Sequence, residues 1–100
     1  MLATVQQFVE FVGREEAIQH SQLNNPESEV IDTARIDSYL TQAATLLNQK
    51  VPITWPCFAH CQLRIARHLL DPYSTREVVT NGYKEAWELV ANRPKVISWM

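Results

Sequence analysis

The segment that decides the fold is "PCFAHCQLRIARHLL", which runs from Pro56 to Leu70. At about 100° per residue, a helix over this segment turns one broad apolar arc to the core. That arc consists of Phe58, Ala59, Ile65, Ala66, Leu69 and Leu70. The other side of the helix is polar and basic, and it consists of Cys57, His60, Arg64, Arg67 and His68, with Cys61 at the boundary. This division predicts a packed helix with a core face and a basic face.

The apolar arc contains one polar residue, Gln62, near its middle. A buried amide that lacks hydrogen bonds costs about 1–3 kcal/mol, so Gln62 needs partners. Another helix of the same domain could supply them, and so could a neighbouring subunit. The sequence leaves both open. Candidate interface residues are Gln62, Arg64, Arg67 and Trp99.

The same segment holds both cysteines and two of the three histidines of the chain, so a metal site and a thiol site have to be considered. Cys57, His60 and Cys61 are close enough on a helix to offer up to three ligands, whereas a structural zinc site takes four. His68 lies about 16 Å from Cys57 along the helix axis, and His20 has no candidate ligand near it. We therefore expect no metal and no cofactor.

The two thiols have two further interpretations. A nucleophilic thiol activated by His60 or Arg64 is disfavoured, because the sequence shows no oxyanion-hole motif and no sign of a substrate pocket. A disulfide between Cys57 and Cys61 is disfavoured, because side chains four residues apart on one helix rarely reach the required geometry. The favoured interpretation is that both cysteines pack as small hydrophobic residues at the boundary of the core.

Helical signals continue on both sides of this segment, and no strand is predicted. Thr4-x-x-Gln7 and Ser74-x-x-Glu77 have the form of capping boxes, and Asp32 is a plausible N-cap. Apolar stripes at helical spacing follow two of these starts: Ile36, Leu40, Ala43, Ala44 and Leu47, then Val79, Tyr83, Ala86 and Val90. The predicted helices run from Thr4 to Gly13, Glu15 to about Leu23, Asp32 to before Pro52, Pro56 to Asp71, and Ser74 to about Asn92.

Length and composition fit one small globular domain. The chain has 100 residues, of which 46% are hydrophobic and 20% are charged, and only two are glycine. So few glycines disfavour an all-β fold with many tight turns. The predicted fold is an all-α, compact bundle of about five helices, with residues 1–100 as a single domain. Residues 95–100 form a C-terminal tail with the apolar residues Val96, Ile97, Trp99 and Met100.

Several classes of protein are disfavoured by the sequence. No apolar run approaches the roughly 18 residues of a membrane span, and the N-terminus lacks the basic start of a signal peptide, which favours the cytoplasm. A net charge of −2 argues against sequence-specific binding of nucleic acid. The chain lacks a Gly-rich phosphate loop, a His-Glu-x-x-His motif and a Gly-x-Ser-x-Gly motif, and Glu15-Glu16 is expected to be a solvated pair at a helix start. We therefore expect no enzyme.

Five segments together resemble a known family. They are "LATVQQFVEFVGREEAIQ" (Leu2 to Gln19), "IDTARI" (Ile31 to Ile36), Ile65-Ala66-Arg67, "EVVTNGYKEAWELVA" and "PKVIS". In this order they resemble the small all-helical proteins encoded in the head gene cluster of Mu-like phages and prophages. The chain departs from that family at Arg64, where an acidic residue is usual, and at His68, where an aromatic is usual. It also lacks an Arg-Tyr pair before "VPI".

The resemblance implies a structural protein of the virion, similar to head-completion or head–tail connector subunits. Such subunits form a ring at the portal and contact other phage head or tail proteins, and they carry no catalytic residues. The protein would be cytoplasmic in the host cell before assembly, and in the virion if the prophage is active. The alternative is a small helical regulator or adaptor with weak DNA or protein binding through Arg64, Arg67, His60 and His68, although this stripe holds only two permanent charges.

Overall fold

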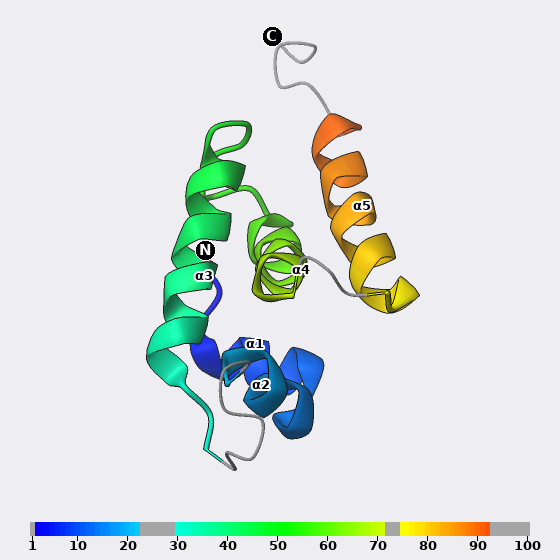
Figure 1. Ribbon diagram of the computed structural model, residues 1–100. Coiled ribbons are helices and arrows are strands. Elements are labelled where there is room, and N and C mark those ends of the chain that lie inside the picture. The colour runs from blue at the N-terminus through cyan, green and yellow to red at the C-terminus, as the bar shows by residue number, and fades with distance from the viewer. Residues whose placement is uncertain (1, 23–29, 72–74, 93–100) are drawn as a thin grey trace, which may run out of the picture.

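A computed structural model describes residues 2–22, 30–71 and 75–92, and these residues form five helices and no strand (Figure 1). The predicted all-α, single-domain fold of five helices is confirmed. The helices are α1 (Val5–Val12), α2 (Arg14–Ser21), α3 (Thr33–Asn48), α4 (Phe58–Leu70) and α5 (Glu77–Ala91).

Side-chain caps set the starts of α1 and α3, as the sequence predicts. The Thr4 hydroxyl accepts a hydrogen bond from the Gln7 amide, and the Gln7 side chain accepts one from the Thr4 amide, so the capping box is formed. The Asp32 carboxylate accepts a hydrogen bond from the Arg35 amide. Gly13 ends α1 with φ 90° and ψ 154°, a conformation that is essentially limited to glycine. It allows α2 to follow α1 without a longer loop.

The starts of α4 and α5 differ from the prediction. Two turns come before α4, in which Trp55 N–H donates to the Pro52 carbonyl and Phe58 N–H donates to the Trp55 carbonyl. The helix therefore begins at Phe58. In α5 the first helical residue is Glu77, and its N-cap is Arg76, which makes no side-chain cap hydrogen bond. The predicted capping box starts at Ser74, which lies outside the described residues.

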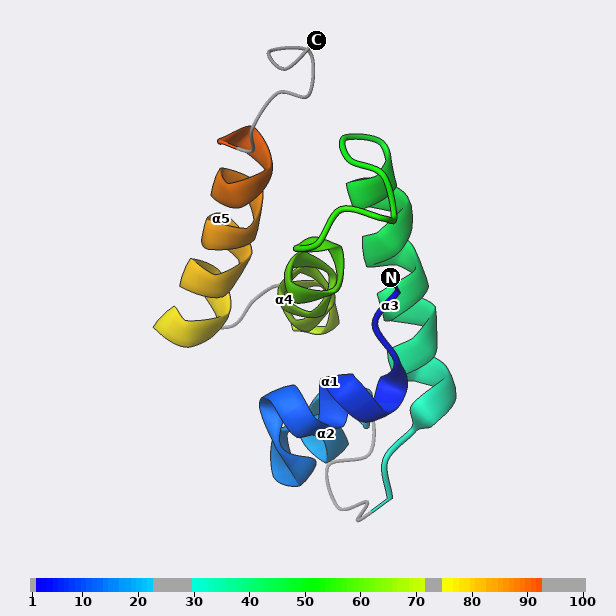
Figure 2. The same ribbon diagram turned by 180° about the vertical axis from the view of Figure 1, so that it is seen from behind.

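Helix α4 is the centre of the arrangement. Figures 1 and 2 show it between α3 and α5, while α1 and α2 lie together at one end of the molecule. The most extensive helix contacts are those of α4 with α3 and with α5, and α2 also contacts α4. Because neighbours lie on several sides of α4, it buries more of its circumference than the apolar arc predicts.

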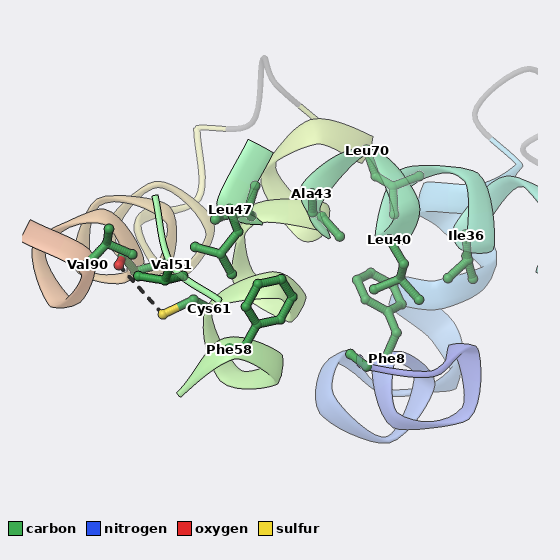
Figure 3. Close-up of a cluster of buried hydrophobic side chains, with 14 of the residues drawn as sticks. Phe8, Ile36, Leu40, Ala43, Leu47, Val51, Phe58, Cys61, Leu70 and Val90 are labelled. Atoms are coloured by element: carbon green, nitrogen blue, oxygen red, sulfur yellow. Dashed lines mark hydrogen bonds between the residues drawn. The ribbon is translucent and has the colours of Figure 1, made fainter. Parts of the chain in front are cut away.

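The core forms where apolar side chains of the other helices pack around α4. Phe8 of α1 points toward Leu40 of α3, and Phe58 of α4 lies beside Leu47 (Figure 3). The predicted stripes are largely confirmed, with Ala44 and Tyr83 only partly buried. The buried core residues of the two stripes are Ile36, Leu40, Ala43, Leu47, Val79, Ala86 and Val90.

Two predictions about the faces of α4 are wrong. Cys61 is fully buried instead of lying at the boundary, and Arg67 is 7% exposed instead of lying on a solvated basic face. The cause is the packing of α5 and α2 against the sides of α4 that the sequence assigns to solvent.

Three predictions lie outside the described residues: the loop at 24–29, the C-terminal tail at 95–100, and Trp99 as an interface residue. Among the helices that the structure describes, none has the length and apolar character needed to cross a membrane.

Candidate functional site

Gln62 joins three separate segments of the chain. Its Nε2 donates a hydrogen bond to the Leu40 carbonyl at 2.8 Å, and its Oε1 accepts one from the Ala3 amide at 2.8 Å. The residue is 2% exposed. The interpretation that the amide is satisfied within the domain is confirmed, and a subunit interface is not required to satisfy it. Gln62 holds the N-terminal residues 2–4 against α3 and α4.

A groove of about 430 Å³ opens beside Gln62. Two apolar side chains flank it, Leu2 at 49% exposure and Ile53 at 40%. Large apolar side chains are normally scattered singly over a solvated surface, whereas these two line the same groove. The remaining lining residues come mostly from α3 and are Leu40, Thr41, Ala44, Thr45, Asn48, Gln49 and Gln62. The groove therefore combines apolar walls with polar groups, as protein contact surfaces do.

Arg67 is held by a buried ion pair. Its Nε and Nη2 donate to the two carboxylate oxygens of Glu16, both at 2.6 Å, and the two side chains are 9% and 8% exposed. Arg76, whose side chain is 51% exposed, also donates to Glu16 at 2.7 Å. The prediction that Glu16 is solvated is therefore wrong, because the side chain faces α4 and not solvent. The pair connects α2, α4 and the start of α5.

Phe11 of α1 lies beneath two guanidinium groups. The Cζ atoms of Arg64 and Arg67 lie 4.7 Å and 5.3 Å from the centre of the Phe11 ring, within the range of cation–π attraction. The Arg64 Nη1 donates to the His60 carbonyl at 3.0 Å. Partial burial lowers the pKa of Arg64, as does the nearby charge of Arg67, while Cys61 and Glu85 act in the opposite direction.

The two cysteines are free thiols with different surroundings. Cys61 is fully buried and its Sγ donates to the Ala86 carbonyl at 3.6 Å (Figure 3). Burial, and secondarily the neighbouring Cys57, raises the pKa of the Cys61 thiol to about 11. Such a thiol stays protonated at neutral pH and is a poor nucleophile. At His60, partial burial and the charge of Arg64 lower the pKa, so the imidazole is neutral at neutral pH.

We predict that Cys61 makes the protein less stable at alkaline pH. Because the folded pKa of about 11 lies above the ordinary value of 9.0, the contribution of Cys61 is complete below pH 9 and is lost as the pH rises toward 11. The loss should be about 1–2 kcal/mol. Urea denaturation of wild type and Cys61→Ala from pH 8 to 11 measures this loss. The difference between their free energies of unfolding should become smaller as the pH rises. A gap that stays constant over this range would contradict the prediction.

The structure places the candidate residues on different sides of α4. Arg64 and Arg67 meet at Phe11, whereas Gln62 lies at the groove beside Leu2. The residues that sequence reasoning missed are Phe11, Glu16 and Arg76. No local pattern marks them, because Glu16 lies 51 and 60 residues from its two partners.

No group of three or more metal-ligating side chains occurs in residues 2–22, 30–71 and 75–92. Comparison of the chain with protein-family models, with curated proteins and with solved structures gives no match.

Proposed function

We propose that this chain is a structural subunit of a phage or prophage particle, of the head-completion or head–tail connector kind, which assembles as a ring at the portal. The resemblance of five segments, in order, to proteins of the head gene cluster of Mu-like phages supports the class of protein. The observation that carries the proposal is the groove flanked by Leu2 and Ile53, because both large apolar side chains are substantially exposed there. Other head or tail proteins are the expected further partners.

A ring built from one kind of subunit needs two different surfaces that fit each other. The groove beside Gln62 is one such surface. The sequence contains a second apolar segment, "KVISWM" at 95–100, with Trp99 as its largest side chain. Large aromatic side chains commonly anchor protein interfaces in apolar pockets. The proposed contact places residues 95–100 of one copy in the groove of the next.

The experiment compares three proteins: full-length chain, a deletion of Lys95 to Met100, and Ile53→Glu. Light scattering over a range of concentrations measures association, and circular dichroism measures helicity. We expect the full-length chain to self-associate and both variants to associate at least about 10-fold more weakly at unchanged helicity, because Ile53 is 40% exposed and its replacement leaves the core intact.

Full-length protein that stays monomeric at millimolar concentration, with a deletion variant that unfolds, would contradict the proposal and make the tail part of the core.

The geometry gives little support to the alternative of a DNA-binding regulator. Arg67, one of the two permanent charges of the predicted basic stripe, has its Nε and Nη2 on Glu16. The remaining charge, Arg64, lies partly buried over Phe11. Few phosphates could be neutralised, so little counterion release is available.

A further inference from the structure

A second hollow, of about 200 Å³, lies between α1, α4 and α5. Phe11, Arg64 and Arg67 form one side of it, and residues of α5 form the other. The α5 residues are Val78, Val79, Asn81, Gly82 and Glu85. Gly82 lies next to Arg64, since a Cβ at Gly82 would make an ordinary van der Waals contact with the Arg64 Cγ at 3.7 Å. The hollow is separate from the groove at Leu2 and Ile53.

We propose that this hollow binds a carboxylate side chain presented by a neighbouring protein chain. Arg64 is the residue that carries the inference. Within the part of the chain that the structure describes, no carboxylate oxygen lies within 4.0 Å of its guanidinium group, and its Nη1 donates to the His60 carbonyl. A guanidinium has five N–H donors, so Arg64 has donors left for a ligand.

The surroundings hold Arg64 ready for an anion. The Phe11 ring lies against both guanidinium groups, which limits the orientations that they can adopt. Partial burial removes some of the water from Arg64, and the same burial lowers its pKa while leaving it charged at neutral pH. A fork of this kind pairs with a carboxylate through two parallel hydrogen bonds. Glu16 occupies the matching fork of Arg67 in the same way.

A single carboxylate fits the hollow better than a polyanion. The space is small, and Glu85 lies at its edge, close enough to influence the pKa of Arg64 without an ion pair at 4.0 Å. The whole chain carries a net charge of −2, which repels nucleic acid. Glu16 already neutralises the charge of Arg67, and Glu85 also lines the hollow, so the positive charge that an isolated acidic side chain meets there is that of Arg64.

The inference rests on the proposed assembly only for the identity of the neighbour, which would be an adjoining subunit of the particle. Binding of a carboxylate to the isolated chain does not require that assembly. The probe is therefore a small molecule with one carboxylate, N-acetylglutamate α-amide, with inorganic phosphate and a short DNA duplex as competing classes. The readouts are the NMR signals of the arginine Nε–H groups and of the Gly82 amide.

We expect saturable shifts at Arg64 and Gly82 with a dissociation constant on the order of a few millimolar, as for one charge-assisted fork at a partly exposed site. Arg64→Met keeps the apolar stem and should weaken binding at least about 10-fold. Arg64→Lys keeps the charge without the fork, so it should bind the carboxylate more weakly than the wild type and more tightly than Arg64→Met. Lys50→Met removes one positive charge from an exposed position at the end of α3 and should leave binding unchanged.

Three results would overturn the inference: no saturable shift in the wild type, equal binding by folded Arg64→Met, or tighter binding of phosphate or duplex DNA than of the carboxylate. Light scattering on the same variants separates the two proposals. Association of the chain that persists when no carboxylate binds would remove this inference and leave the proposed ring contact at the groove intact.

Discussion

Arg67→Met is expected to lower the free energy of unfolding by about 3–5 kcal/mol, because it leaves the buried Glu16 carboxylate without its main partner. Both hydrogen bonds of the pair are 2.6 Å long, and the two side chains are less than 10% exposed. Arg76 still reaches Glu16, but its side chain is half exposed and cannot replace a buried bidentate partner. A domain of this size has about 5–15 kcal/mol of stability in total, so the variant is left with little.

The measurement is urea denaturation followed by circular dichroism, on the single variants and on the double variant Arg67→Met with Glu16→Leu. Because apolar residues of similar size often replace a buried ion pair without loss, the double variant should be more stable than Arg67→Met alone. Arg76→Gln is the control, with an expected loss of at most about 1 kcal/mol for a half-exposed pair. A double variant that loses the sum of the two single losses would show that Arg67 and Glu16 do not act as a pair.

The burial of the ion pair between Arg67 and Glu16 could not be predicted from the sequence. The helical wheel of residues 56–70 places Arg67 correctly on the side of α4 away from Phe58 and Ile65. It assumes, however, that this side meets solvent. The assumption fails because α2 and α5 pack there, through contacts between residues that are distant in the sequence: Glu16 lies 51 residues from Arg67, and Cys61 lies 25 residues from Ala86. Burial of Cys61 was missed for the same reason.

Local signals performed better than face assignments. The caps at Thr4 and Asp32 and the end of α1 at Gly13 involve hydrogen bonds and backbone angles within a few residues, so the sequence predicts them. At Pro56 the local pattern misplaced the helix start, because the turns at 52–58 use up the residues before Phe58. The buried amide of Gln62 was predictable from its place among aliphatic neighbours. Its partners, Ala3 and Leu40, were not.

Gln62→Leu is expected to lower the free energy of unfolding by about 2–3 kcal/mol, although leucine is similar in size and more apolar. The Ala3 amide is the reason. It is a buried donor whose partner is the Gln62 Oε1, and a buried donor without a partner costs about 1–3 kcal/mol. The Leu40 carbonyl loses less, because it belongs to the hydrogen-bonding ladder of α3.

Two measurements separate this local effect from a general loss of packing. Hydrogen exchange of the Ala3 amide should become roughly 5- to 150-fold faster, the range that corresponds to the lost 1–3 kcal/mol. Amides in the middle of α4 should change only in proportion to the global stability. Gln62→Met serves as a second variant with a flexible side chain of similar length and should behave in the same way as Gln62→Leu.

The consequence for the proposed assembly follows from the position of Leu2. Gln62 holds residue 3, so release of the Ala3 amide also frees Leu2, which forms one wall of the groove. We therefore expect Gln62→Leu to weaken self-association as well, at concentrations where the helices remain formed. Ile53→Glu, which also lies in the groove, should weaken association without faster exchange at Ala3. If Gln62→Leu exchanges rapidly at Ala3 and still associates as strongly as the wild type, the wall at Leu2 is not part of the contact and the groove must be removed from the proposed interface.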